Sequence, residues 1–176
     1  MLDLNIATAN FDSVSLKDFR KEVTEQINQR RNSIKEELIK VKKEILVQTD
    51  LKAEAAKQGD RSENAEYQAA IDALAALNIA KVRLESRLEA YDSYDVSETN
   101  QTCIDIGSTV KLRFKGRILM MVLTTSAISD YTIGTISSTS PVGQELMGLR
   151  PSEDNMRIVA NVRGTACEYE ILEVLL

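Results

Sequence analysis

Two carboxylates three residues apart, Asp60 and Glu63, are the side chains of this sequence best placed to do chemistry. They lie in the stretch GDRSENAEYQ, between two long segments with a helical apolar pattern. Mg²⁺ takes about six oxygen ligands and is usually held by one or two carboxylates together with waters and phosphates. The pair alone should therefore bind the ion poorly. It becomes effective where another molecule supplies the remaining ligands, as in a two-metal phosphoryl-transfer site.

The same pair also has a structural interpretation that needs no metal. Asp60 can N-cap the second helix, with Glu63 as its capping-box partner. Acidic side chains in a first helical turn suit the positive end of the helix dipole, and Glu66 extends the same ridge as surface charge. The spacing of the residues leaves both interpretations open.

The segment before the pair predicts one long helix that begins after Ser15, an N-cap with Asp18 as its capping-box partner. No Pro or Gly occurs until Gly59, which we expect to end the helix. Arg30 interrupts the apolar stripe, whose members recur mostly every three or four residues. The stripe consists of Leu16, Phe19, Val23, Ile27, Ile34, Leu38, Val41 and Ile45.

The segment after the pair carries a coiled-coil pattern, in which Lys81 fills the one missing seam position. Two helices joined by so short a turn must run antiparallel and pack their stripes together. The sequence therefore predicts a helical hairpin with the acidic pair at its tip. The second stripe consists of Ala70, Leu74, Leu77, Leu84, Leu88 and Tyr91.

From about Thr102 the apolar period changes to two, which is typical of strands. Strands are predicted at 110–114, 118–123, 131–136, 156–160 and 168–175, with turns at Lys115-Gly116 and Gly164. Ser140-Pro141 predicts the start of a short helix that ends at Gly148. The predicted fold class is α+β: an antiparallel coiled-coil hairpin followed by a small, mostly antiparallel sheet domain with one short helix.

These patterns predict four parts. Residues 1–14 form a leader without a sustained period, residues 15–92 the hairpin with its tip near 59–64, residues 93–101 a polar linker, and residues 102–176 the sheet domain.

Composition excludes several function classes. The formal net charge is -5, which disfavours general nucleic-acid binding. The chain has no His, and its two cysteines, Cys103 and Cys167, lack CxxC spacing, so we expect reduced thiols and no zinc site. It has no long apolar run and no signal-peptide pattern, so we expect a cytoplasmic protein that does not bind membranes.

Two motifs together resemble a known family. The tip stretch GDRSENAEYQAA, residues 59–70, is similar to the tip motif of the bacterial Gre transcript-cleavage factors of the GreA/GreB type. IGTIS followed by SPVGQELMG, within 133–148, resembles the family's I-S-x-x-S-P-x-x-x-x-L-x-G segment. The closing GTACEYEILEV is similar to its last strand, so the resemblance covers about residues 16–176.

The resemblance implies partners and roles. Gre factors bind bacterial RNA polymerase through an FKBP-like C-terminal domain and place the hairpin tip in the secondary channel of a backtracked complex. Asp60 and Glu63 are then expected to help hold the polymerase's Mg²⁺ during cleavage near the nascent RNA 3′ end. Arg61, Ser62, Asn64 and Tyr67 are expected to shape the tip or contact the polymerase. The chain would be a monomer with no cofactor of its own, and not an enzyme by itself.

Departures from the family pattern keep other functions open. Many members carry basic residues near the tip where this chain has Ala56 and Ile71, although Lys57 and Arg61 lie nearby. A regulator that occupies the channel without promoting cleavage is therefore the second hypothesis. A coiled-coil interaction protein whose tip acids are only helix caps is the third. Prolyl isomerisation, which rests on the FKBP-like fold alone, is the fourth.

Overall fold

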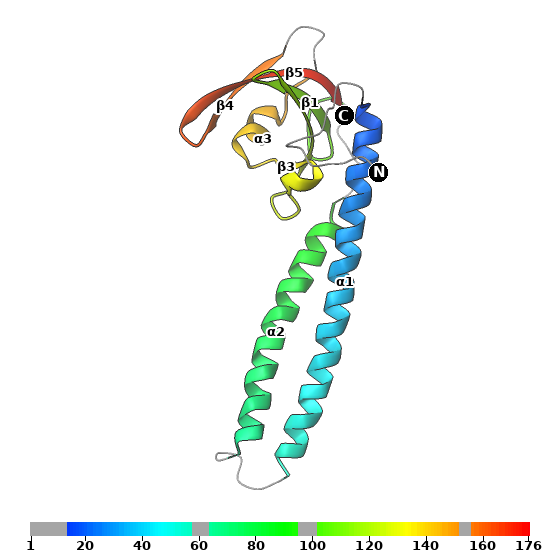
Figure 1. Cartoon of the computed structure of the whole chain (residues 1–176), viewed down its shortest axis with the longest axis vertical. Coiled ribbons are helices and arrows are strands. Elements are labelled where there is room, and N and C mark those ends of the chain that lie inside the picture. The colour runs from blue at the N-terminus through cyan, green and yellow to red at the C-terminus, as the bar shows by residue number, and fades with distance from the viewer. Residues whose placement is uncertain (1–13, 58–63, 95–101, 152–155) are drawn as a thin grey trace. The chain divides into compact units, whose positions relative to one another are not determined.

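The computed structural model describes residues 14–57, 64–94, 102–151 and 156–176 (Figure 1). Contacts divide the chain into two compact units. The sheet unit joins the described residues up to Asn28 with those from Ser93 onward, and the hairpin unit is Gln29–Asp92. One continuous helix, α1 (Leu16–Ala55), contributes to both.

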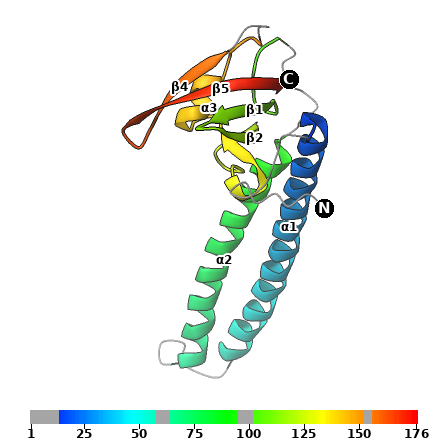
Figure 2. The ribbon, with the colours of Figure 1, turned by 45° about the horizontal axis from the view of Figure 1, so that its top comes forward.

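The sheet unit is built on a curled five-stranded sheet (Figure 2). The strand order is β3-β2-β1-β5-β4. Neighbours pair antiparallel except β2 and β3, which are parallel, so the sheet is mixed and the predicted α+β class is confirmed. The strands are β1 (Thr109–Phe114), β2 (Arg117–Thr124), β3 (Thr135–Ser137), β4 (Arg157–Val162) and β5 (Thr165–Leu175).

The strand predicted at 131–136 is wrong in its first half. Residues Tyr131–Ile133 form a 3-10 turn, and β3 begins only at Thr135. The Asp130 carboxylate accepts hydrogen bonds from both the backbone N–H (2.7 Å) and the hydroxyl (2.6 Å) of Thr132, which closes the turn. Gly134 then reverses the chain with φ of 82°. The local Asp–Thr bonds prevail over the strand propensity of Tyr and Ile.

The short helix α3 (Pro141–Leu146) begins as predicted. The Ser140 hydroxyl accepts a hydrogen bond from the backbone N–H of Gly143 (3.1 Å), and Pro141 occupies the first helical position. Leu146 is fully buried in the core that α3 and the sheet share. The core residues are Ile104, Val110, Leu112, Met121, Leu123, Ile136, Val142, Leu146, Ile158, Ala160, Tyr169 and Ile171.

The first three turns of α1 belong to the sheet unit rather than to the hairpin seam. Leu16, Phe19, Val23 and Ile27 are all buried there. A Cβ built on Gly134 would lie 2.5 Å from Cζ of Phe19, so the ring fills the space that glycine leaves. Ser15 is the N-cap as predicted, since its hydroxyl accepts a hydrogen bond from the Asp18 N–H (3.1 Å). The same hydroxyl donates to the Asp18 carboxylate (2.7 Å), so the two residues pair through the hydroxyl.

In the hairpin unit the rest of α1 runs antiparallel to α2 (Ala65–Asp92) (Figure 1). The predicted stripes face each other, with Ile34, Leu38, Leu84 and Tyr91 buried. The break in the stripe at Arg30 lies two residues beyond the boundary between the units. Nearby, Arg31 Nε lies 2.6 Å from Asp92 Oδ1 as an ion pair, although it is not aligned as a hydrogen bond. None of the described helices is long and apolar enough to cross a membrane.

Candidate functional site: the end of the helical hairpin

The two helices of the hairpin are fastened at their tip end by one side chain. The Asn64 carbonyl oxygen Oδ1 accepts hydrogen bonds from the backbone N–H groups of Glu66 and Tyr67, both at 3.1 Å. The Asn64 amide Nδ2 donates to the backbone carbonyl of Ala55 at 2.8 Å. Asn64 therefore N-caps α2 and at the same time satisfies a carbonyl at the end of α1.

This arrangement excludes one of the two interpretations of Asp60 and corrects one prediction. Asp60 is not the N-cap of α2, because Asn64 occupies that position and α2 begins at Ala65. Gly59 does not end α1, because the helix already ends at Ala55. Glu63 and Asp60 themselves lie outside the described residues.

The remaining predicted tip residues also fall partly inside and partly outside the described part of the chain. Arg61 and Ser62 lie outside the described residues, whereas Asn64 and Tyr67 are described. The Tyr67 side chain is half-buried, and Lys52 Nζ lies 5.7 Å from the centroid of its ring, within range of a cation–π contact. Ala55 and Ala70 are both buried, and side chains of that size allow two helices to approach closely. Asn64 and Tyr67 thus help to hold the end of the hairpin together.

The basic side chains near this end are partly engaged. Lys57 Nζ lies 2.9 Å from Glu54 Oε2, both side chains being largely exposed. Ala56 and Ile71, the positions where basic residues were expected, are half-buried. Among residues 14–57, 64–94, 102–151 and 156–176, no three Cys, Asp or Glu side chains gather as metal ligands.

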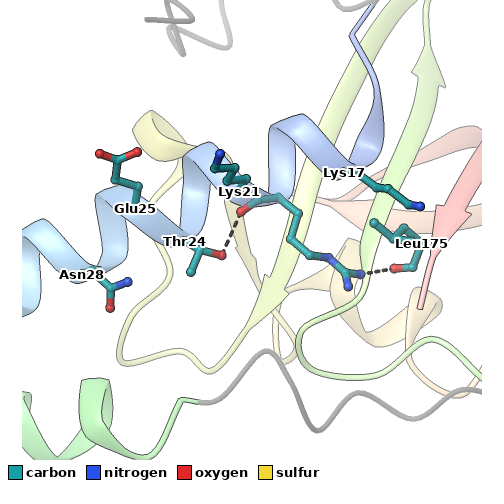
Figure 3. Close-up of a pocket in the computed structure, with 7 residues that line it drawn as sticks. Lys17, Lys21, Thr24, Glu25, Asn28 and Leu175 are labelled. Atoms are coloured by element: carbon teal, nitrogen blue, oxygen red, sulfur yellow. Dashed lines mark hydrogen bonds between the residues drawn. The ribbon is translucent and has the colours of Figure 1, made fainter.

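A second candidate site is a groove of about 550 Å³ along the start of α1, in the sheet unit (Figure 3). Its polar centre is the Arg20 guanidinium, which donates from Nε to the Thr109 hydroxyl (2.8 Å) and from Nη2 to the Leu175 carbonyl. Figure 3 shows Lys17 and Lys21 on the same stretch of helix. The groove is lined by Lys17, Arg20, Lys21, Thr24, Glu25, Asn28 and Leu175.

The polar centre of this groove connects elements of the sheet unit to one another. Arg20 is half-buried and its donors are used to fasten α1 to β1 and to the end of β5. Burial lowers the pKa of Arg20 and raises the pKa of the neighbouring Tyr94 to about 12. The Tyr94 hydroxyl is buried and has no hydrogen-bond partner among the described residues. Both pKa shifts follow from desolvation of the two side chains. The hairpin end remains the stronger candidate for the functional site.

Comparison with known proteins decides the family. Residues 98–175 match the family model described as transcription elongation factor, GreA/GreB, C-term. The chain is 34% identical over 150 residues to "Transcription elongation factor GreA" of Chlorobium phaeobacteroides, covering 81% of this chain and 91% of that one. The chain belongs to the GreA/GreB family of transcription elongation factors. The expected family is thus confirmed.

Further relatives agree with this family. The chain is 36% identical over 124 residues to the GreA of Flavobacterium johnsoniae, covering 69% of this chain and 77% of that one. Among solved structures it is similar to the GreA factor homolog 1 (Gfh1) of Thermus thermophilus, at 19% identity and a TM-score of 0.35, covering 82% of this chain and 94% of that one. At that TM-score the likeness carries no further argument.

In this Gre factor the family motif pointed to Asn64 as a tip residue, but the sequence pattern did not identify it as the N-cap of α2. Asn is among the strongest N-cap residues, and Asn64 directly precedes the start of α2. Asp60 and Glu63 matched a capping box equally well, so the capping interpretation of the pair placed the N-cap four positions too early. The signal that could have found Asn64 is the uninterrupted helical stretch beginning at Ala65.

Proposed function

We propose that this Gre factor inserts the tip of its hairpin into the secondary channel of bacterial RNA polymerase and stimulates the polymerase's own Mg²⁺-dependent cleavage of backtracked RNA. The FKBP-like sheet domain of residues 102–176 would supply the contact with the polymerase. The chain would act as a monomer in the cytoplasm, and it would lend groups to an active site that belongs to its partner.

One observation carries the proposal: Asn64, rather than Asp60, caps α2. The structural role that would have explained Asp60 is therefore filled by another residue. Within a Gre factor, a tip carboxylate without a capping role is best explained by what it does for a partner. The same argument applies to Glu63, whose suggested role was that of a capping-box partner to Asp60.

The donor chemistry of the pair fits a shared Mg²⁺ and not a resident one. Carboxylate oxygens are suitable ligands, but two of them leave most of the coordination shell to be filled by other groups. Mg²⁺ bound there would stabilise negative charge on the reacting phosphate and lower the pKa of a bound water. Asp60 and Glu63 would help to hold the ion, while Asn64 and Tyr67 keep the helix ends beside them together.

The test is RNA cleavage in a stalled, backtracked elongation complex, comparing wild type with Asp60→Asn and Glu63→Gln. We expect either substitution to reduce stimulation about 100-fold or more, in the range seen when a preorganised catalytic group is removed. Glu66→Gln is the matched control, because it removes one carboxylate from the exposed first turn of α2. Cleavage by Asp60→Asn at the wild-type rate would contradict the proposal.

The second candidate function, occupation of the channel without cleavage, is favoured by the half-buried Ala56 and Ile71, which replace basic residues near the tip. It predicts that wild type slows nucleotide addition and leaves cleavage unchanged. The same complexes distinguish the two functions.

A further inference from the structure

The hairpin unit carries an apolar face that its own helices do not cover. Ile39 and Leu46 on α1 and Val82 on α2 are between 54% and 66% exposed. Single exposed apolar residues are ordinary, but several on one face indicate an interaction surface. We call these three residues the hairpin face.

An ion pair shows that the three residues share one side of the hairpin. On α1, Ile39, Lys42 and Leu46 follow each other at steps of three and four and so form one ridge. On α2, Val82 and Glu85 are three apart on another ridge. Lys42 Nζ lies 3.1 Å from Glu85 Oε1, which places the two ridges side by side. The apolar residues therefore lie around this ion pair.

The charges around the face have opposite signs on the two helices. The α1 ridge continues to Lys35, four residues before Ile39, and the α2 ridge continues to Glu89, four residues after Glu85. Because α1 and α2 run antiparallel and Lys42 pairs with Glu85, Lys35 and Glu89 lie at about the same level. One ridge is basic and the other acidic.

We propose that the hairpin face binds a second copy of this chain. A two-fold axis parallel to the helices would place α1 of one copy over α2 of the other, with Lys35 opposite Glu89 and Leu46 opposite Val82. A two-fold axis across the helices would instead place lysine against lysine. The charge pattern thus selects the arrangement in which both hairpins point the same way, four helices packing as a bundle.

Sedimentation velocity of the full chain, from roughly 1 to 500 µM, measures the association, since a patch of this size suits a weak interface. Leu46→Glu should weaken the dimer at least about tenfold, because it places a charge in the centre of the apolar contact. Val47→Glu is the matched control. Val47 is also exposed, but it points about 100° away around the helix. A wild type that stays monomeric, or equal effects of the two substitutions, would overturn the proposal.

A charge-exchange experiment tests the arrangement directly. Lys35→Glu and Glu89→Lys should each weaken self-association, because both replace an attraction between copies by a repulsion. A mixture of the two variants should associate about as strongly as wild type, since every intermolecular pair is then again of opposite sign. If the mixture associates no better than either variant alone, the arrangement is wrong.

Dimerisation would have one consequence that rests on the proposed function. A hairpin paired along its face is twice as bulky, so it would compete with insertion into the polymerase channel. The two proposals fail separately, because sedimentation needs no polymerase and the cleavage assay at low concentration needs no dimer. A monomeric wild type whose Leu46→Glu variant loses binding to RNA polymerase would assign the face to the polymerase and overturn the dimer.

Discussion

One helix, α1, spends its first three turns and its remaining length in different surroundings. In the sheet unit its apolar side chains Leu16, Phe19, Val23 and Ile27 are all buried, and Arg20 is bonded to two strands. In the hairpin unit the same helix buries Ile34 and Leu38 but leaves Leu46 and Leu51 exposed. The comparison shows that one helix can pack into a full hydrophobic core at one end and against a single neighbouring helix along the rest of its length.

The difference would suit the proposed insertion of the hairpin tip into a partner. A seam two helices wide gives few apolar contacts per turn, so local opening of the hairpin should cost less free energy than opening of the sheet unit. The bonds of Asn64 to both helices are then important, because they join the last residue of α1 to the first turn of α2.

The largest expected effect comes from a substitution in the part of α1 that packs in the sheet unit. Phe19→Ala should destabilise the sheet unit by about 3–5 kcal/mol, because it removes a fully buried ring packed against Gly134. Ile34→Ala, on the same helix, should destabilise the hairpin unit and leave the sheet unit nearly unchanged. Hydrogen exchange, followed separately for amides of β1 and α2, distinguishes the two. Equal loss of protection in both units after either substitution would contradict the comparison.

The next effect is a dependence of the stability of the sheet unit on pH. Burial raises the pKa of Tyr94 from its ordinary value near 10 to about 12. The unfolded chain therefore ionises this phenol first, so its contribution is fully present below about pH 10 and is lost as the pH rises to about 12. The loss should amount to roughly 2–3 kcal/mol when complete, and to about half of that by pH 11.

Urea unfolding of the sheet unit at pH 9 and near pH 11 measures this loss, and Tyr94→Phe is the control. That variant should show a smaller decrease over the same interval. It should also be no less stable at neutral pH, since the hydroxyl that it removes has no partner among the described residues. An unchanged decrease in the variant would assign the effect to other groups.

The smallest expected effect concerns Asn64 and the local stability of the hairpin near its tip. Asn64→Ala should cost about 1–2 kcal/mol of local stability, because it removes the N-cap and the bond to Ala55. Asn64→Asp keeps the acceptor that caps α2 but loses the donor to Ala55, so it should cost less. Exchange rates of the Glu66 and Tyr67 amides report the cap. If both variants leave those rates unchanged, Asn64 does not fasten the hairpin.

The sequence predicted most elements of this fold because their signals are local. The Ser15 and Ser140 caps, the alternation in β1 and the turn at Gly164 are each specified within a few residues. The surroundings of a helix are not specified locally. The stripe from Leu16 to Ile45 has one period throughout, and nothing in that period says that its first part packs in the sheet unit and the rest against α2.

The candidate site was predicted in part for the same reason. The acidic pair and its family motif were located from the sequence, but Asp60 was the only N-cap considered there, and the cap is Asn64. The bond from Asn64 to Ala55 joins residues nine apart across the turn, and no local pattern contains it. Where two adjacent stretches both offer cap residues, tertiary contacts decide between them.

The central claim, that the tip carboxylates act through the polymerase's Mg²⁺, is tested most directly by the Mg²⁺ dependence of stimulated RNA cleavage. Wild type, Asp60→Asn and Glu66→Gln are compared at saturating factor over a series of Mg²⁺ concentrations. We expect Asp60→Asn to raise the Mg²⁺ concentration for half-maximal cleavage about tenfold, an effect typical of a lost interaction with a bound ion, while Glu66→Gln matches wild type. An unchanged Mg²⁺ dependence of Asp60→Asn, whatever its rate, would contradict the account.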